Sequence, residues 1–186
     1  MTVRKVIRMG HPVLREKSRP LSEEEILSSE TQNFIKDLFD TMEKYEGIGI
    51  ASPQVGVAWQ LAIVGVPVDN PRYPDTPESD TYIVINPKVT ILDKKKQGFW
   101  EGCLSVPGLR GYVERPRKIK VEFLDEKAQP QSLIVEDFIA TVFQHELDHL
   151  NGKLYIDRIK DTKMLAYNEE FDEFWTEEDE EDEADE

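Results

Sequence analysis

Cysteine and long apolar stretches are both scarce in this chain of 186 residues. Its single cysteine, Cys103, cannot form an intrachain disulfide, which excludes the disulfide-stapled scaffolds of small secreted proteins. The longest nearly uninterrupted apolar run, residues 61–68, falls far short of the roughly 20 residues that span a bilayer. The first ten residues carry three basic side chains, but no apolar stretch of signal-peptide length follows them. We therefore expect a cytoplasmic protein without a membrane span.

Basic residues are too few to balance the acidic ones, and the formal net charge is −15. Residues 169–186 contain thirteen Asp or Glu and no Lys or Arg, so the other 168 residues carry a net charge of only −2. A block of like charges is typical of a solvated, self-repelling segment. We expect one domain over residues 1–168 and a flexible acidic tail over residues 169–186. Without a basic excess, direct binding to nucleic acid is not expected.

Two segments, residues 22–46 and 135–151, have apolar side chains at three- and four-residue steps, which predicts a helix in each. Ser22 followed by Glu25 has the pattern of a capping box, in which each residue caps the other at the start of a helix. Gly152 is placed to end the second helix, because glycine readily adopts the left-handed conformation found there.

The region between the two helices has the composition of strands and loops. Residues 47–56 are rich in glycine and are typical of a loop, and four prolines within residues 67–77 predict an exposed excursion. Short strands rich in Val, Ile and aromatic residues are expected at 60–66, 82–85, 88–92, 112–114 and 118–123. The whole pattern indicates an α+β fold.

Two of the three histidines stand four residues apart in the second predicted helix, in the sequence His145-Glu146-Leu147-Asp148-His149. Residues at this spacing project from one face of a helix about one turn apart, so both imidazoles can bind one metal ion. Glu146 is placed to act as a general base toward a water at the metal. The alternative is a solvated helix face that carries this arrangement by chance.

A catalytic site of this type needs a third protein ligand and an open coordination position. The metzincin pattern would require a histidine where this chain has Tyr155. A thermolysin-like site would use a downstream glutamate, and Glu169 has a suitable spacing, although it begins the acidic run. Cys103, flanked by glycine and proline in segment 101–107, is the other candidate. A structural site with four ligands would need a further Cys or His at suitable spacing, which the chain lacks.

Three segments resemble, in order, the motifs of the peptide deformylase family. They are Gly47-Ile48-Gly49-Ile50-Ala51-Ser52-Pro53-Gln54-Val55-Gly56, Glu101-Gly102-Cys103-Leu104-Ser105 and Gln144-His145-Glu146-Leu147-Asp148-His149. The segment His11-Pro12-Val13-Leu14-Arg15 is similar as well, and the resemblance covers roughly residues 5–160. Ser52 is a mild departure, since the family more often has alanine there.

The resemblance implies a fold of short antiparallel strands packed around a central metal-binding helix. It also implies a metal-dependent hydrolase that removes the formyl group from the N-terminal methionine of nascent polypeptides. Cys103, His145 and His149 would then bind one divalent metal ion. Glu146 would serve as general base and then as acid, while a water on the metal attacks the formyl carbon.

The same resemblance assigns the residues around the substrate. Gln54 and the backbone N–H of Leu104 would donate to the developing oxyanion. The methionine pocket and the peptide path would be formed by Phe99, Phe138, Val142, Ile48, Gly49 and Gly102. Phe138 and Val142 also fit the buried face of an amphipathic helix. Glu101 and Arg115 are expected to pair behind the cysteine loop, and Arg110 is expected to flank the peptide entrance.

The metal and the partners are implied less directly. A Cys-His-His donor set suits zinc, and it also suits iron or nickel. The resemblance implies Fe²⁺ in the cell, with Zn²⁺, Ni²⁺ or Co²⁺ as substitutes. The expected partners are N-formylmethionyl peptides and the ribosome near its exit tunnel, although the acidic residues 177–186 disfavour docking on RNA through that end. The alternative functions are a thermolysin-like endopeptidase and a non-catalytic protein with a structural metal.

Overall fold

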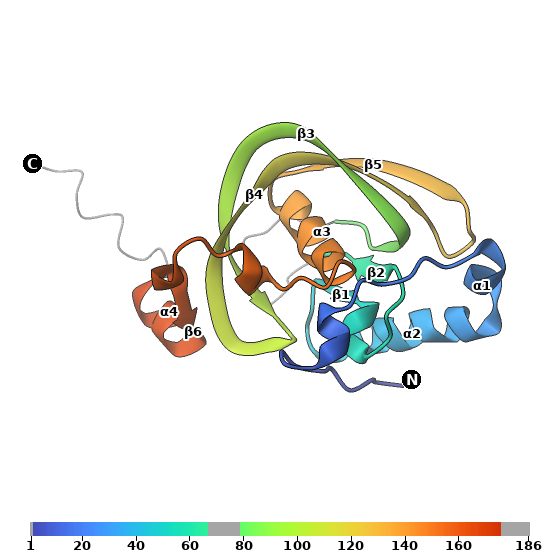
Figure 1. The fold of residues 1–186 in the computed structure, drawn as a ribbon, viewed down its shortest axis with the longest axis horizontal. Coiled ribbons are helices and arrows are strands. Elements are labelled where there is room, and N and C mark those ends of the chain that lie inside the picture. Colours follow the sequence, from blue (N-terminus) through green and yellow to red (C-terminus); the bar gives the residue numbers. More distant parts are fainter. Residues whose placement is uncertain (1, 67–78, 176–186) are drawn as a thin grey trace, which may run out of the picture.

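The computed structural model describes residues 2–66 and 79–175 of the chain. Its strands form one antiparallel sheet in the order β1-β2-β3-β4-β5, and β6 pairs with β4 (Figure 1). The elements are α1 (Glu23–Leu27), α2 (Ser29–Lys44), β1 (Gly49–Ala51), β2 (Leu61–Val64), β3 (Tyr82–Cys103), β4 (Val106–Leu124), β5 (Pro130–Glu136), α3 (Asp137–His149), β6 (Leu165–Tyr167) and α4 (Asn168–Phe174). No helix among the described residues is long and apolar enough to cross a membrane.

The first predicted helix is divided into α1 and α2 at Ser28. The backbone of Ser28 is extended, with φ −66° and ψ 150°, and its side chain accepts a hydrogen bond from the N–H of Thr31. Serine favours such caps because its hydroxyl competes with the backbone for hydrogen bonds. The capping box of Ser22 and Glu25 is confirmed at the start of α1. The second predicted helix is confirmed as α3, and Gly152 follows it with a left-handed φ of +69°.

The strands β3 and β4 are much longer than the strands that the sequence predicts. Each joins two predicted strands into one curved ribbon, and shifts of register near residues 91–96 bend it. Charged residues interrupt the apolar pattern where the ribbon is exposed, so the sequence predicts only its more apolar parts. The predicted loop at 47–56 contains β1, and β5 and β6 were not predicted. The proline-rich excursion at 67–77 lies outside the described residues.

The core lies on both faces of the short strands β1 and β2. Ala62 and Val64 pack with Phe143 of α3 on one face, while Leu61 and Ile63 pack with α2 on the other. This alternation follows from the two-residue period of a strand. In Figure 1 the ribbon of β3, β4 and β5 arches over α3. The helix that carries both histidines is therefore enclosed between β2 and the ribbon.

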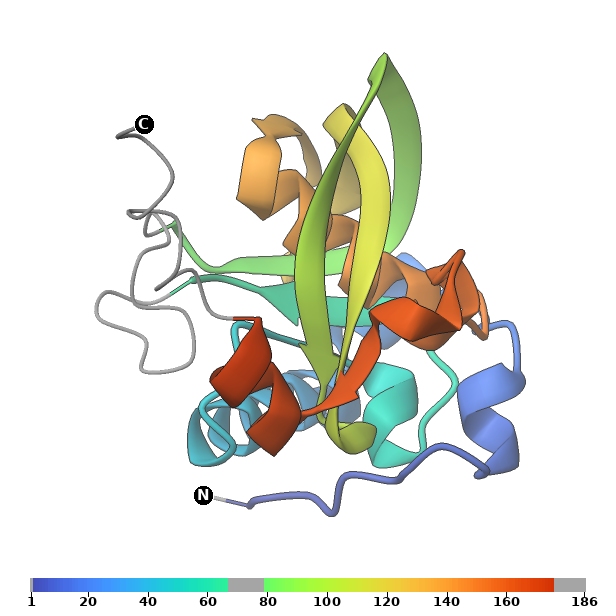
Figure 2. The same ribbon diagram turned by 90° about the vertical axis from the view of Figure 1, so that its left-hand side faces the viewer.

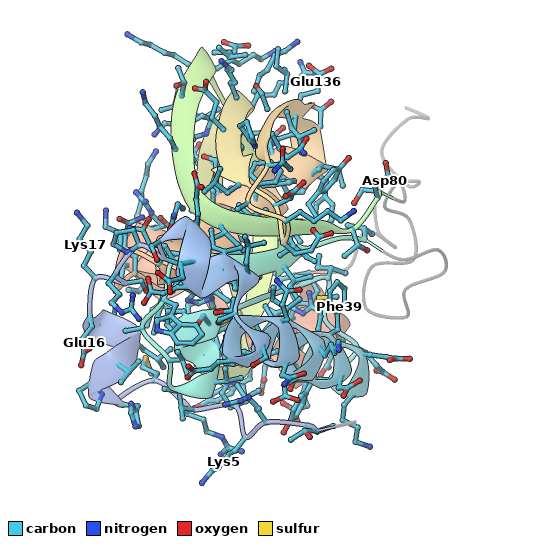
Figure 3. All side chains as sticks on the ribbon, turned by 90° about the vertical axis from the view of Figure 1, so that its right-hand side faces the viewer. Lys5, Glu16, Lys17, Phe39, Asp80 and Glu136 are labelled. Atoms are coloured by element: carbon cyan, nitrogen blue, oxygen red, sulfur yellow. The ribbon has the colours of Figure 1, made fainter. Side chains whose placement is uncertain are left out.

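Charged side chains project from the outside of this arrangement. Figure 3 labels Lys5, Glu16, Lys17 and Glu136, which lie at the periphery of the view. The predicted acidic tail begins within α4, which extends to Phe174, and residues 176–186 lie outside the described part of the chain. Figure 2 shows α4 beside the end of the ribbon where β3 turns into β4.

Candidate metal centre

Cys103, His145 and His149 come together in the interior of the protein. Cys103 is the last residue of β3, and the two histidines lie on successive turns of α3. All three side chains are buried, and their possible ligand atoms lie within 4.8 Å of one another. The distance from Cys103 Sγ to His149 Nε2 is 3.5 Å. Cys103 lies 42 and 46 positions before the two histidines in the sequence, and the fold brings all three residues into one cluster.

The spacing of these atoms fits a metal ion. Bonds of about 2.3 Å to sulfur and about 2.0–2.1 Å to nitrogen in a tetrahedral site place the two ligand atoms roughly 3.5 Å apart. The Nδ1 of His145 lies 2.7 Å from a carboxylate oxygen of Glu101, which leaves its Nε2 for the cluster. A carboxylate on the far side of an imidazole orients the ring and makes it a stronger ligand. The donor set is therefore suited to a divalent transition metal.

The electrostatics of the cluster favour a cation. Burial raises the pKa of the Cys103 thiol, but the charge of His149 and the hydrogen bonds from both histidines outweigh burial and lower this pKa well below its ordinary value. Burial lowers the pKa of His145, whereas Cys103 and Glu101 raise it well above its ordinary value. The thiolate and the Glu101 carboxylate thus create negative potential at the imidazoles. A bound metal ion would compete with protons for the same donors.

Glu146 lies against the glycine-rich segment of β1. An added Cβ on Gly49 would come within 2.6 Å of Glu146 Oε1, so only glycine leaves room for the carboxylate as it is placed. The other oxygen, Oε2, is buried and has no hydrogen-bond partner among the described residues. Burial raises the pKa of this carboxyl group. A buried carboxylate oxygen without a partner is suited to accept a proton from a water or a substrate.

A chain of buried ion pairs supports the metal ligands from behind. Arg115 Nε donates to Glu101 Oε1 at 2.6 Å, and Arg115 Nη1 donates to Asp148 Oδ2 at 2.8 Å. At the surface end of this chain, the exposed Arg158 also binds Asp148, with Nη2 2.5 Å from Oδ1. Burial raises the pKa of Glu101, but His145 and Arg115 lower it more, so this carboxyl stays ionised. The predicted pairing of Glu101 with Arg115 is present, and it continues to the helix that carries the histidines.

Gln54 and Leu104 are both neighbours of Cys103, one in space and one in the chain. The side chain of Gln54 is buried, its Oε1 accepts a hydrogen bond from the N–H of Ala51 at 2.7 Å, and its Nε2 lies 3.6 Å from Cys103 Sγ. Leu104 follows Cys103 in the turn between β3 and β4. Both residues line the cavity that contains Cys103, His145 and Glu146. The hydrogen bond from the N–H of Ala51 therefore fixes the orientation of the Gln54 side-chain amide.

The cavity contains most of the residues that the sequence assigned to the substrate. Its walls include the predicted Ile48, Gly49, Gly102, Phe138 and Val142. Phe99 is not part of the wall, but its ring meets the ring of Phe138 edge-on, with centroids 5.4 Å apart. Sequence reasoning missed Gly47, Trp100 and Thr141, which also line the cavity. Trp100 had a usable signal, because it immediately precedes the cysteine motif.

The rival third ligands lie elsewhere. Glu169 is exposed in the first turn of α4, and it is not part of the cluster found among the described residues. Tyr155 is buried with its ring stacked on His145, at a centroid distance of 6.1 Å, and its hydroxyl donates to the backbone oxygen of Leu109. Tyr155 thus packs against a predicted ligand. Of the three candidates, only Cys103 is placed to share an ion with both histidines.

Known proteins similar to this chain were found by sequence and by structure. The model of the polypeptide deformylase family matches residues 3–164. A peptide deformylase of Leptospira biflexa serovar Patoc is 49% identical over 172 residues, which cover 92% of this chain and 96% of that protein. Peptide deformylase 2 of a Nostoc species is 43% identical over 171 residues, with 92% and 94% covered.

Solved structures with a similar fold carry the same family name. The class I type b peptide deformylase of Acinetobacter baumannii, in its Met-Ala-Ser-bound crystal structure, aligns with a TM-score of 0.81 at 36% identity. The alignment covers 85% of this chain and 99% of that one. Both kinds of similarity include the segments that carry Cys103 and the two histidines.

We expect the substitution Arg115→Leu to lower the free energy of unfolding by about 3–5 kcal/mol, because Glu101 and Asp148 would remain buried without their shared cation. Arg117→Leu is the matched control, since Arg117 also pairs with a carboxylate, Asp137, but at the surface. That change should have little effect. Urea-induced unfolding of both variants measures the difference. Equal losses of stability would contradict the role given to the buried pairs.

Proposed function

Since the chain belongs to the polypeptide deformylase family, we propose that Cys103, His145 and His149 bind the metal ion of a hydrolase that removes the formyl group from the N-terminal methionine of nascent polypeptides. The observation that supports this most is the convergence of one thiol and two imidazoles within 4.8 Å. Three protein ligands leave one position of a tetrahedral ion open, as catalysis requires. The finding that Glu169 is outside the cluster disfavours a thermolysin-like endopeptidase.

The residues of the chain carry the proton transfers. A divalent ion bound by Cys103 and the histidines would supply Lewis acidity to the water and to the formyl oxygen. Glu146 takes a proton from the attacking water at its carboxylate and delivers it to the amine nitrogen as the C–N bond breaks. The products are formate and the free amino terminus. The burial of Glu146 beside Gly49 keeps its carboxylate in place and raises its pKa. A raised pKa suits a group that must both accept and return a proton.

Two hydrogen-bond donors close to Cys103 are our candidates for stabilising the oxyanion. We assign this role to the side-chain N–H of Gln54 and the backbone N–H of Leu104, which line the same cavity. The hydrogen bond from Ala51 to Gln54 Oε1 fixes the amide, so that its nitrogen faces the cluster. Donors that are fixed before the reaction stabilise a developing charge without reorganisation.

The peptide has a strand edge to follow. Among the described residues, β2 pairs with β3 only at residues 82–85, and β4 pairs with β3 at residues 99–102 from one side. Residues 100–102 line the cavity together with Gly47, Ile48 and Gly49. A peptide can add there as a strand, with its methionine directed toward Phe138 and Val142. The Met-Ala-Ser complex of the Acinetobacter baumannii enzyme supports a peptide ligand of this kind.

The biological setting follows from the substrate. We propose that the protein acts in the cytoplasm on N-formylmethionyl chains as they leave the ribosome, and that its metal in the cell is Fe²⁺. The soft thiolate and the two imidazoles suit iron, zinc, nickel or cobalt. Contact with the ribosome would use the body of the protein, because the acidic C-terminal residues repel RNA.

The first test compares four purified proteins that are prepared without oxygen and assayed on formyl-Met-Ala-Ser. Cys103→Ala should lose both bound metal and activity, because one of three ligands is removed. Glu146→Ala should keep the metal and lose at least about a hundredfold in kcat, as expected for a general base. Glu169→Ala should match the wild type in both. Activity that tolerates Cys103→Ala but not Glu169→Ala would overturn the proposed site.

The close approach of Gly49 to Glu146 gives a second test. In Gly49→Ala the added methyl group would lie within 2.6 Å of Oε1 of Glu146 as it is now placed, so the carboxylate must shift. We expect kcat on formyl-Met-Ala-Ser to fall by about a hundredfold, because small displacements of a catalytic group have large effects. Metal content should not change. Gly10→Ala serves as the control: Gly10 is exposed, an added Cβ there meets no atom within 4 Å, and only its left-handed φ of +104° is strained. An unchanged kcat for Gly49→Ala would show that Glu146 does not need its observed position.

A third test concerns the metal. A ferrous thiolate site should lose activity progressively in air as Cys103 is oxidised, and protein kept under nitrogen should retain it. Half-lives of activity in the two atmospheres, together with the mass of the peptide that contains Cys103, measure this. Protein loaded with Zn²⁺ is the control and should be less sensitive to air. Identical half-lives for the iron-loaded protein would contradict the expected oxidation of Cys103.

A further inference from the structure

Trp100 lies in the wall of the metal cavity and packs against residues 165–175, which contain β6 and α4 and are called the C-terminal segment below. Its indole ring lies 5.1 Å from the ring of Phe171 and 5.1 Å from that of Trp175, measured between centroids. On the neighbouring strand, Tyr112 lies 6.0 Å away. Aromatic pairs at such distances hold each other in defined orientations.

The backbone fixes this segment to the strand that follows the cysteine motif. The strand β6 pairs with β4 through Leu109↔Tyr167, Arg110↔Ala166 and Gly111↔Leu165. The helix α4 starts directly afterwards, and the guanidinium of Arg110 lies 4.9 Å from the centre of the Phe171 ring. Figure 2 shows α4 beside the ribbon at the end that carries the cysteine turn. The C-terminal segment is therefore attached to the rim of the site by both backbone and side chains.

A groove leads from the metal cavity toward this segment. It has a volume of about 350 Å³ and shares Gly102, Cys103 and Leu104 with the cavity. Asn168, the first residue of α4, forms part of its far wall. Trp100 lines the cavity and lies two residues before Gly102, where the groove begins. A peptide that runs along residues 100–102 from the cavity into the groove would therefore start beside this indole.

Phe171 and Trp175, which contact Trp100, follow the stretch that the family model matches. The family match ends at residue 164, whereas β6 and α4 occupy residues 165–174. Much of the segment remains accessible to solvent, since Trp175 is 42% exposed and Phe174 is 67% exposed. What the segment does cover is Trp100, a residue of the cavity wall.

We propose that β6 and α4 form a specificity element, in which Phe171 and Trp175 position Trp100 as an apolar platform for the second and third residues of the peptide. The inference rests on the proposed function, since it assigns a role in binding the substrate of that same site. Trp100 contacts the substrate, and Phe171 and Trp175 act through it. The element favours peptides with apolar or aromatic side chains after the methionine, because such groups gain most from an aromatic platform.

The test measures kcat and KM separately for formyl-methionine amide and for formyl-Met-Phe-Phe amide. Trp100→Ala should raise KM for the longer substrate by about three- to tenfold and leave its kcat within about twofold, as expected for the loss of aromatic contacts. The KM for the short substrate should change less than the KM for the longer one. Phe171→Ala should act in the same direction with a smaller effect, and Trp100→Phe should restore most of the affinity. Phe174→Ala is the matched control on the same helix and should match the wild type.

Binding of the product Met-Phe-Phe amide, measured by calorimetry on the metal-loaded protein, gives a readout that does not need turnover. The wild type should bind it about three- to tenfold more tightly than Trp100→Ala does. Equal affinities, or equal increases in KM on both substrates, would overturn the inference. Failure of the proposed function has a different signature, because the wild type would then hydrolyse neither formylated substrate.

Discussion

A thiolate buried between two imidazoles is the constraint on which the rest of this structure depends. Cys103 comes from the end of a strand and the histidines come from a helix, so the two elements must be held together across the site. The buried pairs of Arg115 with Glu101 and Asp148 do this, because Glu101 precedes the cysteine turn and Asp148 lies on the histidine helix. The same Glu101 accepts from His145. Charge and position are thus set by one continuous network.

The fold explains why this network can be buried. The ribbon of β3 and β4 arches over α3, and β1 and β2 close the other side. A surface site would screen these charges with water, and the ion pairs would contribute little. In the interior, the removal of one charged side chain leaves its partner buried without compensation, which destabilises the whole network. Space is equally tight around Glu146, where an added Cβ on Gly49 would come within 2.6 Å of Oε1.

Local patterns in the sequence account for much of the site and for part of the fold. The spacing of His145 and His149 predicted one helix face, and the capping box of Ser22 and Glu25 predicted the start of α1, because both depend on residues within one turn. The residues alone left Cys103 and Glu169 open as third ligands, since that choice depends on long-range packing; the family resemblance favoured Cys103. The full length of β3 and β4 could not be predicted, because exposed charged residues interrupt their apolar pattern. The contacts of Trp100 with Phe171 and Trp175 could not be predicted either, because these residues are distant in the sequence.

The coordination of the metal is the central claim, and X-ray absorption at the metal edge of the loaded protein tests it most directly. For the zinc-loaded form, the account predicts one sulfur at about 2.3 Å and two imidazole nitrogens at about 2.0–2.1 Å, with one further light atom. The sulfur signal should vanish in Cys103→Ser. A spectrum of the wild type without sulfur, or with a carboxylate in its place, would contradict the account.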